Sequence, residues 1–547
     1  MGLMGMQQHA SRRGHLSVAD EARGRPRGRP QALPVEPNEL GSPTIDPGRR
    51  LAWVLATNRL LSPDARLSAR EPFIAALQAE GVSADSSRVS RWESARLRIP
   101  EPVLAAYERL LGLPDGAIAS LDRLLRRTSG RSASLSDAAE NVDHARLDEL
   151  FAAVEAGRAT GGEWLHLATG LARTDRVYVH PDTWQRVTGT LVSELTRSGG
   201  VAMLRRFEAA SLLIAHPRAR AHLSRQVGEF VTDPDAQNMV PALALLRVVG
   251  DEPAAELVLR LLGSENGLLR RGAAEVAGSL ASQGVFTGTR ADALERFVGY
   301  ELRRIDDVGR RIDVLDLVGQ VSEEAFARLH SAVPEPRSKR VLLRARTQRE
   351  IGDADLCRIV AEGVATFAEA ALGRTAHDPD LMLRRLVREA LFHTQRERRH
   401  LAAVTLSLSP YARAVGRALL ELTTDPDTQV AAMAWSTLRR LGHVVDRETV
   451  ATAALRERRD ELRPRALLTL GLCHGPLRDG DAAALVQSAC DPRSSAEEQH
   501  AAVFALGMAG HPCLQQAATS ESPMAPAARW WLRSGPSLHD DDVVTPG

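Results

Sequence analysis

Four residues near position 90 have side chains that could read the edges of DNA bases. They lie in the segment 86–100, which reads S-S-R-V-S-R-W-E-S-A-R-L-R-I-P. On a helix, Val89 and Trp92 share one face, whereas Ser87 points the opposite way. Short hydroxyl groups allow close approach in a major groove, and an arginine can contact guanine O6 and N7 together. The candidate base contacts are Ser86, Ser87, Arg88 and Arg91, and the packing residues are Val89 and Trp92.

The flanking sequence predicts the elements that would hold this helix. Residues 48–61 carry leucine and valine at helical spacing and predict a first helix. Residues 69–79 predict a second helix, with Pro72 in its first turn, where a missing amide hydrogen has little effect. Asp85 is placed to cap the base-reading helix by accepting from its free amides. A fourth helix is predicted over 102–111.

Four short helices in this order, over 48–115, resemble the XRE family of phage-repressor-like helix-turn-helix proteins. The resemblance implies that Ser86, Ser87 and Arg91 contact bases, with Arg88 beside them near base or phosphate. It also implies phosphate contacts by Arg96 and Arg98, which would fix the register without reading sequence. The alternative is an ordinary amphipathic helix that serves only for packing.

The resemblance is less complete just after the base-reading helix. Trp92 matches the large apolar core position of the family, and Glu93 matches the acidic residue after it. The family usually has glycine two residues after that acid, whereas this chain has Ala95. Alanine tolerates a left-handed backbone less well, by about 1 kcal/mol. We therefore expect a turn that differs from the one usual in the family.

The first 47 residues predict a disordered basic arm, because they are rich in Gly, Pro, Arg and Ser and lack a sustained period. Residues 23–30 read R-G-R-P-R-G-R-P, which twice contains the core of an AT-hook. An extended Arg-Gly-Arg fits a narrow minor groove, whose negative potential attracts arginine. The alternative is coding from a GC-rich genome, which readily generates such tracts. The candidate minor-groove residues are Arg23, Arg25, Arg27 and Arg29.

The composition of the 547 residues favours helices and separates two parts of the chain. Aromatic residues make up only 4%, so the core must be aliphatic and rich in alanine. The formal charge is +1, but residues 1–131 hold 20 basic and 14 acidic residues, a net charge of +6. The remainder therefore carries −5. The positive part is the one that contains the predicted helix-turn-helix.

Two segments far apart in the chain are alike. Residues 233–250 read D-P-D-A-Q-N-M-V-P-A-L-A-L-L-R-V-V-G, and residues 425–442 read D-P-D-T-Q-V-A-A-M-A-W-S-T-L-R-R-L-G. An aspartate, a proline, a second acid and a final glycine are typical of a helix with both ends specified. We therefore expect Asp425 and Pro426 to begin an inner helix and Gly442 to end it.

Weaker copies of this pattern recur at spacings of about 30 to 47 residues, which fits helical-pair repeats. The pattern resembles HEAT repeats. The resemblance implies an all-α protein, with the helix-turn-helix domain followed by an α-solenoid over 141–535. Stacked pairs would leave one long concave surface, of a kind that usually holds proteins or peptides. A linker over 116–140 and a disordered tail over 536–547 complete the predicted domains.

Enzyme motifs are missing from the sequence. There is no phosphate-binding P-loop, no nucleophile elbow and no zinc-ligand spacing, so we expect no enzyme, no cofactor and no metal. His393 and His400 lie among arginines and are expected on a solvated surface. No run of 18 apolar residues predicts a membrane span, and no secretory signal is evident. We expect a cytoplasmic, nucleoid-associated protein.

These features favour a sequence-specific DNA-binding transcription regulator. Double-stranded DNA is the expected partner of the helix-turn-helix, and a protein or peptide, or a second copy in a homodimer, is the expected partner of the repeat body. One alternative is a peptide- or ligand-responsive regulator with the concave face as its sensor. Another is a HEAT-like DNA-processing enzyme that holds DNA on a basic concave face, against which the −5 charge of the body argues.

Overall fold

The fold is all-helical, as the sequence predicted. A computed structural model describes residues 33–42, 44–130, 143–173, 178–303, 314–374 and 378–539. Every regular element within these ranges is a helix, and β pairing there is limited to isolated bridges.

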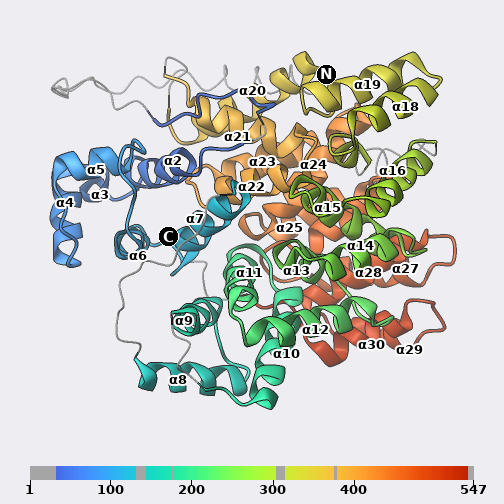
Figure 1. The fold of residues 1–547 in the computed structure, drawn as a ribbon, viewed down its shortest axis with the longest axis horizontal. Coiled ribbons are helices and arrows are strands. Elements are labelled where there is room, and N and C mark those ends of the chain that lie inside the picture. Colours follow the sequence, from blue (N-terminus) through green and yellow to red (C-terminus); the bar gives the residue numbers. More distant parts are fainter. Residues whose placement is uncertain are drawn as a thin grey trace.

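Six N-terminal helices build a head with its own small core. They are α2 (Pro47–Leu60), α3 (Ala65–Ser68), α4 (Arg70–Ala79), α5 (Ser86–Trp92), α6 (Glu101–Leu110) and α7 (Ala117–Thr128). The core that they share includes Phe73, Leu77, Val89, Trp92 and Tyr107. Figure 1 shows α3, α4 and α5 at the outer edge of the molecule, away from the helices that follow α7.

The helices that follow form the body. Its first half contains α8 (His144–Glu155), α9 (Gly161–Ala172), α10 (Pro181–Arg197), α11 (Gly200–Ala215), α12 (Ala219–Thr232), α13 (Val240–Val249), α14 (Glu252–Leu262), α15 (Gly267–Ser282), α16 (Thr289–Leu302), α18 (Glu323–Ala332) and α19 (Pro336–Thr347). Its second half contains α20 (Ala354–Ala371), α21 (Leu381–Phe392), α22 (Arg396–Ser407), α23 (Ala412–Leu422), α24 (Thr428–Arg440), α25 (Arg447–Arg456), α26 (Arg463–Gly471), α27 (Asp479–Cys490), α28 (Ala496–Ala509), α29 (Leu514–Thr519) and α30 (Ala525–Ser534).

Body helices pack against their second neighbours along the chain, which is the pattern of stacked helical pairs. One inner row consists of α9, α11, α13 and α15, and a second consists of α22, α24, α26 and α28. Outer helices stack in the same way, with α8, α10 and α12 in the first half and α25, α27 and α29 in the second. The body is therefore built from successive helical pairs.

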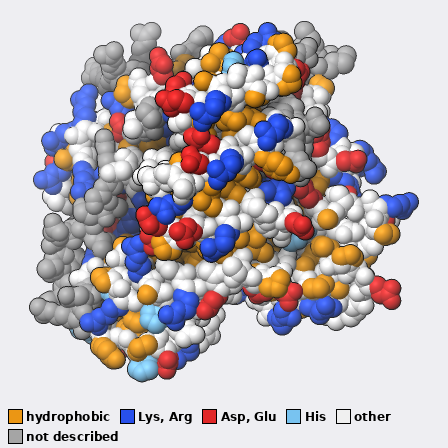
Figure 2. All heavy atoms as spheres, turned by 45° about the vertical axis from the view of Figure 1, so that its right-hand side comes forward, with side chains coloured by type: hydrophobic (Ala, Val, Ile, Leu, Met, Phe, Trp, Pro, Cys, Tyr) orange, Lys and Arg blue, Asp and Glu red, His pale blue; other side chains and the backbone are white. Residues whose placement is uncertain are grey.

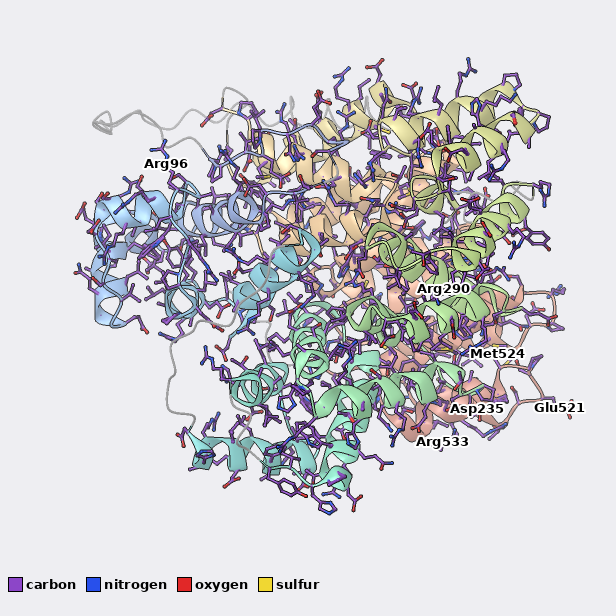
Figure 3. The ribbon with its side chains drawn as sticks, in the orientation of Figure 1. Arg96, Asp235, Arg290, Glu521, Met524 and Arg533 are labelled. Carbon is purple, nitrogen blue, oxygen red and sulfur yellow. The ribbon has the colours of Figure 1, made fainter. Side chains whose placement is uncertain are left out.

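The two inner rows face each other, so the predicted concave surface encloses a cavity between them. Helix α22 packs against both α15 and α7, and residues of both rows surround one cavity. The end of the chain returns to the first half, where the backbone N of Leu538 donates to the carbonyl of Arg197 at 2.9 Å. Arg533 lies near Asp235 at 4.0 Å (Figure 3). The predicted tail is thus bonded to the body over its described residues, up to 539.

The repeat pattern placed some helix ends wrongly. Helix α24 is capped by Asp427, whose carboxylate accepts two amides of the first turn at 2.8 and 3.2 Å. Asp425 accepts from the backbone N of Asp427 at 2.8 Å, within the turn before the helix, and Gly442 lies in a 3-10 turn after it. In the other segment, residues 233–250, only the predicted helix end was correct. Gly250 terminates α13 with φ of 60°, but the helix begins at Val240.

Helix α2 belongs to the head and to the body. Leu51 and Leu55 pack in the core of the head. Trp53 and Val54 lie in the core of the body. Because adjacent residues of one helix are buried on opposite sides, the head is fixed to the body rather than tethered to it.

Part of the predicted disordered arm is packed, so that prediction was wrong for residues 33–42 and 44–46. The carboxylate of Glu36 is buried, and it accepts from Nε of Arg50 at 2.8 Å. It also pairs with Arg385 of α21 at 2.7 Å. These two arginines hold the segment on the body because a buried carboxylate needs charged partners.

The predicted linker over 116–140 was wrong in its first part, where α7 lies. The carboxylate of Glu108 accepts three backbone amides at the start of α7, at distances between 2.6 and 3.2 Å. Ile118 packs in the core of the head, and Leu125 packs in the core of the body. Helix α7 is therefore a second rigid connection between the two parts. Residues 131–142 lie outside the described ranges.

Candidate nucleic-acid interface

A short turn joins α4 to α5 in the way that the sequence predicted. Gly81 follows α4 with φ of 81°, a left-handed conformation that glycine adopts without steric cost. Asp85 accepts from the backbone N of Arg88 at 2.7 Å and so caps α5, which confirms the predicted cap. The turn and the cap together fix where α5 begins.

Helix α5 has one buried face and one exposed face. Val89 and Trp92 are only 0% and 3% exposed, so the predicted packing role of both is confirmed. Ser86, Ser87 and Arg91 are exposed. The polar face carries the residue types that base contact requires, and the fold leaves it open.

The two arginines of α5 differ in freedom. Arg88 donates through Nη1 to the carbonyl and the hydroxyl of Ser83, both at 2.7 Å. Its guanidinium is therefore held toward the turn. Within the described ranges, the side chain of Arg91 makes one long hydrogen bond, 3.4 Å from Nε to the carbonyl of Ser87. Of the two side chains, that of Arg91 is the freer to extend toward a ligand.

A buried ion pair joins the end of α5 to α2, and the sequence analysis missed it. Arg59 donates through Nε and Nη2 to the two carboxylate oxygens of Glu93, at 2.6 and 2.7 Å. The hydroxyl of Tyr107 donates to the same carboxylate at 3.3 Å. Burial, and then the charge of Glu93, raises the pKa of Tyr107 well above its usual value. Because breaking a buried pair is costly, this contact keeps α5 in place.

The turn after α5 is left-handed at Ala95, with φ of 58°. The backbone N of Arg96 donates to the carbonyl of Arg91 at 2.8 Å, and that of Ala95 donates to the carbonyl of Trp92 at 3.1 Å. The expectation that alanine would change this turn was therefore wrong. The hydrogen bonds of the turn compensate the strain of a left-handed alanine, which is about 1 kcal/mol.

Two cations follow this turn on the surface of the head. Arg96 and Arg98 are exposed, and neither side chain has an ion pair or a hydrogen bond within the described ranges. Figure 3 shows Arg96 pointing outward from the head. Both lie close in sequence to the exposed face of α5, so the structure keeps the predicted phosphate contacts near the predicted base contacts. The arm residues Arg23, Arg25, Arg27 and Arg29 lie outside the described residues, and their role stays a prediction.

The two histidines expected on a solvated surface are inside the body, so that expectation was wrong. Burial, together with Arg398, lowers the pKa of His393 well below its usual value. Burial and the neighbouring Arg247 lower the pKa of His400 to about 3. Among the described residues, no group of three or more His, Cys, Asp or Glu could hold a metal ion. In the same ranges, no helix has the length and apolar character needed to cross a membrane.

Comparisons with known proteins identify no family for the chain. No protein-family model matches the chain, and no curated protein does. One similar solved structure concerns tubulin recruitment and assembly by microtubule polymerases with tumor overexpressed gene (TOG) domain arrays. It is 11% identical, covers 72% of this chain and 93% of its own, and has a TM-score of 0.20. A TM-score this low supports no argument about the fold or the partner of the present chain.

Proposed function

We propose that the chain is a sequence-specific DNA-binding transcription regulator in which α5 enters the major groove. The observation that carries the proposal is the division of α5 into two faces. Val89 and Trp92 anchor the helix in the head, while Ser87 and Arg91 stand on the open side. Small hydroxyls beside an arginine suit the close approach and the bidentate contact that guanine offers.

The position of α5 in the molecule supports the same function. Figure 1 places α3, α4 and α5 at the edge of the head farthest from the body, so a duplex has room to approach. Arg96 and Arg98 are without protein partners within the described ranges and lie just beyond α5. Such cations bind phosphates and thereby fix the register of a helix in the groove. Binding of this kind would place the protein on the nucleoid.

The body is a poorer candidate for holding DNA. In Figure 2, Lys and Arg side chains on the visible face are interspersed with Asp and Glu, and they do not form a continuous basic surface. The inner helices face each other around a cavity of about 200 Å³, which is far too small to hold the duplex that the DNA-processing alternative needs. We therefore assign DNA contact to the head. Protein contacts or dimerisation would then use the outer helices of the body.

Selection of DNA sites from a random pool with the full-length chain tests the proposal. A single recurrent motif should emerge, and Arg91→Ala should bind it more weakly by about 1 to 3 kcal/mol. Binding to random DNA should change little, because the lost contact is to a base. The matched control is Arg225→Ala, which removes an exposed arginine from α12 in the body and should leave affinity unchanged. If no motif emerges, or if Arg91→Ala weakens random and selected DNA equally, the proposal fails.

A further inference from the structure

A cavity of about 200 Å³ lies at the centre of the body, between the two inner rows. Helices α11, α13 and α15 contribute one side of its wall, and α22, α24, α26 and α28 contribute the other. Most of the wall is apolar, including Leu204, Phe207, Leu269, Val404 and Leu468. An apolar cavity with a few polar groups is the usual form of a small-molecule site.

The charged residues of the cavity wall carry more positive than negative charge. Arg247, Arg439 and Arg440 line the cavity, and Glu275 is the single acid among its described lining residues. Glu275 already has a partner, because Nε of Arg396 lies 3.5 Å from it. Burial opposes its ionisation, but the charges of Arg396 and Arg440 lower its pKa to about 2. The wall therefore keeps an excess of positive charge.

One of these arginines lacks a hydrogen-bond or ion-pair partner among the residues that the structure describes. Arg247 pairs with Glu397 at 3.4 Å, and Arg440 donates to the carbonyl of Ser436 at 2.8 Å. The side chain of Arg439 makes no hydrogen bond or ion pair with any described residue. Burial, followed by the charge of Arg440, lowers the pKa of Arg439 to about 9, so it stays charged at neutral pH. Arg439 is only partly exposed, and an unpaired cation with limited access to water is stabilised when an anion joins it.

A second polar group on the wall is also without a partner. Both ring nitrogens of His443 are shielded from solvent and have no hydrogen bond. The first residue of α11 approaches this ring so closely that only glycine fits, because a Cβ on Gly200 would lie 2.3 Å from Cγ of His443. Burial lowers the pKa of His443 to about 4, so the ring is neutral at pH 7. Buried polar atoms without partners are uncommon, and they indicate a missing ligand or water.

We propose that this cavity binds a small organic anion, a carboxylate carried on an apolar body, with Arg439 as its counter-ion. A single negative charge matches the single unpaired arginine. The apolar body would fill the space between Phe207 and Val404, where it would be removed from water.

The cavity is also connected to the head through α7. Leu124 of α7 is part of the wall. The ring of Phe207 lies under two guanidinium groups, that of Arg247 at 5.0 Å and that of Arg127 of α7 at 5.8 Å from its centroid. The other end of α7 packs in the core of the head through Ile118. A ligand that moves Phe207 would therefore shift the helix that supports the DNA-binding face. This part of the inference rests on the proposed function.

Binding of decanoate to the full-length protein tests the site without DNA. Decanoate should raise the melting temperature, whereas the neutral analogue 1-decanol should raise it far less. Arg439→Met should weaken decanoate binding about thirtyfold or more, as loss of a buried charge pair does. The same variant should melt at a higher temperature than the wild type without ligand, because it removes an unpaired, partly buried cation. Arg225→Met, on the surface of α12, is the matched control.

Three results would overturn the site: equal effects of decanoate and 1-decanol, unchanged decanoate affinity in Arg439→Met, or a lower melting temperature of that variant without ligand. The connection to the head is measured separately as DNA affinity with and without decanoate. A change of about fivefold or more, absent in Arg439→Met, supports it. If decanoate binds through Arg439 and DNA affinity stays the same, the connection through α7 is wrong. Absence of DNA binding in either condition overturns the proposed function and leaves the cavity site standing.

Discussion

The indole Nε1 of Trp53 donates to both carboxylate oxygens of Asp380, at 2.9 and 3.0 Å. Trp53 lies on α2 of the head, and Asp380 caps α21 of the body by accepting from the backbone N of Leu383 at 3.0 Å. The ring of Trp53 also stacks on Tyr411, with centroids 6.0 Å apart. One carboxylate thus caps the start of a body helix and anchors the helix on which the head is built.

The first prediction concerns this anchor. Asp380→Ala removes a helix cap, which contributes about 1 kcal/mol, and leaves the indole N–H buried without a partner, at about 1 to 3 kcal/mol. We expect the free energy of unfolding, measured with urea, to fall by about 2 to 4 kcal/mol. In a Trp53→Phe background, the same substitution should lower the free energy of unfolding only by the contribution of the helix cap. Equal losses in the two backgrounds would show that the indole contact contributes nothing.

The second prediction is that the head depends on the body. A fragment of residues 44–130 would expose apolar side chains that the full chain buries, among them Trp53 and Leu124. Each such side chain contributes about 1.5 to 3 kcal/mol when buried. We expect the fragment to melt, by circular dichroism, well below the full-length protein and to aggregate more readily. A fragment as stable as the whole chain would contradict the shared role of α2 and α7.

The third prediction concerns the phosphate contacts. Each contact between an arginine and a phosphate contributes about one counterion to the salt dependence of binding. The double variant Arg96→Ala, Arg98→Ala should therefore lower the slope of log affinity against log salt by about two, on any DNA sequence. Titrations at several salt concentrations measure the slope, with Arg225→Ala as the control. An unchanged slope would show that Arg96 and Arg98 do not contact phosphates.

Local patterns explain what the sequence could predict. The cap at Asp85 and the faces of α5 depend on residues a few positions apart, so both were predicted correctly. The pair between Arg59 and Glu93 joins residues 34 positions apart, and no local pattern contains it. In the sequence, the one hint of this pair is an arginine late in the predicted first helix. That signal is weak because 69 of the 70 basic residues are arginine.

The way in which the two halves of the body pack together could not be predicted from the repeat pattern. Each repeat specifies how it packs on its neighbours, but the approach of α15 to α22 joins distant repeats. His393 illustrates the consequence. Its arginine neighbours suggested a solvent-exposed surface, yet Arg398 and Arg399 are buried with it. Arg398 pairs with Glu389, which also binds Arg50 of the head, so these charges are partnered inside.

The fourth prediction distinguishes the two aspartates before α24. Asp427 accepts two amides of the first turn, so Asp427→Ala should lower the free energy of unfolding by about 1 kcal/mol. Asp425 accepts one amide within an exposed turn, and Asp425→Ala should have a smaller effect. Urea unfolding of the two variants side by side makes the comparison. If Asp425→Ala lowers the free energy of unfolding more than Asp427→Ala does, Asp425 is the cap, as the repeat pattern predicted.

The last prediction concerns acid stability. Burial lowers the pKa of His443 to about 4, from an ordinary value of about 6.5 in the unfolded chain. Between these values the unfolded chain binds a proton that the folded protein does not, so the free energy of unfolding must fall as the pH falls from 6.5 towards 4. At pH 5 this one residue accounts for a loss of about 2 kcal/mol relative to pH 8.

Glutamine cannot take up this proton, so His443→Gln should reduce the difference in unfolding free energy between pH 8 and pH 5 by about 2 kcal/mol. The substitution can also change stability by the same amount at every pH, which the difference removes. His144→Gln, at an exposed histidine that begins α8, is the matched control and should leave the difference unchanged. If His443→Gln unfolds with the same pH dependence as the wild type, the histidine is not held neutral in the wall of the cavity.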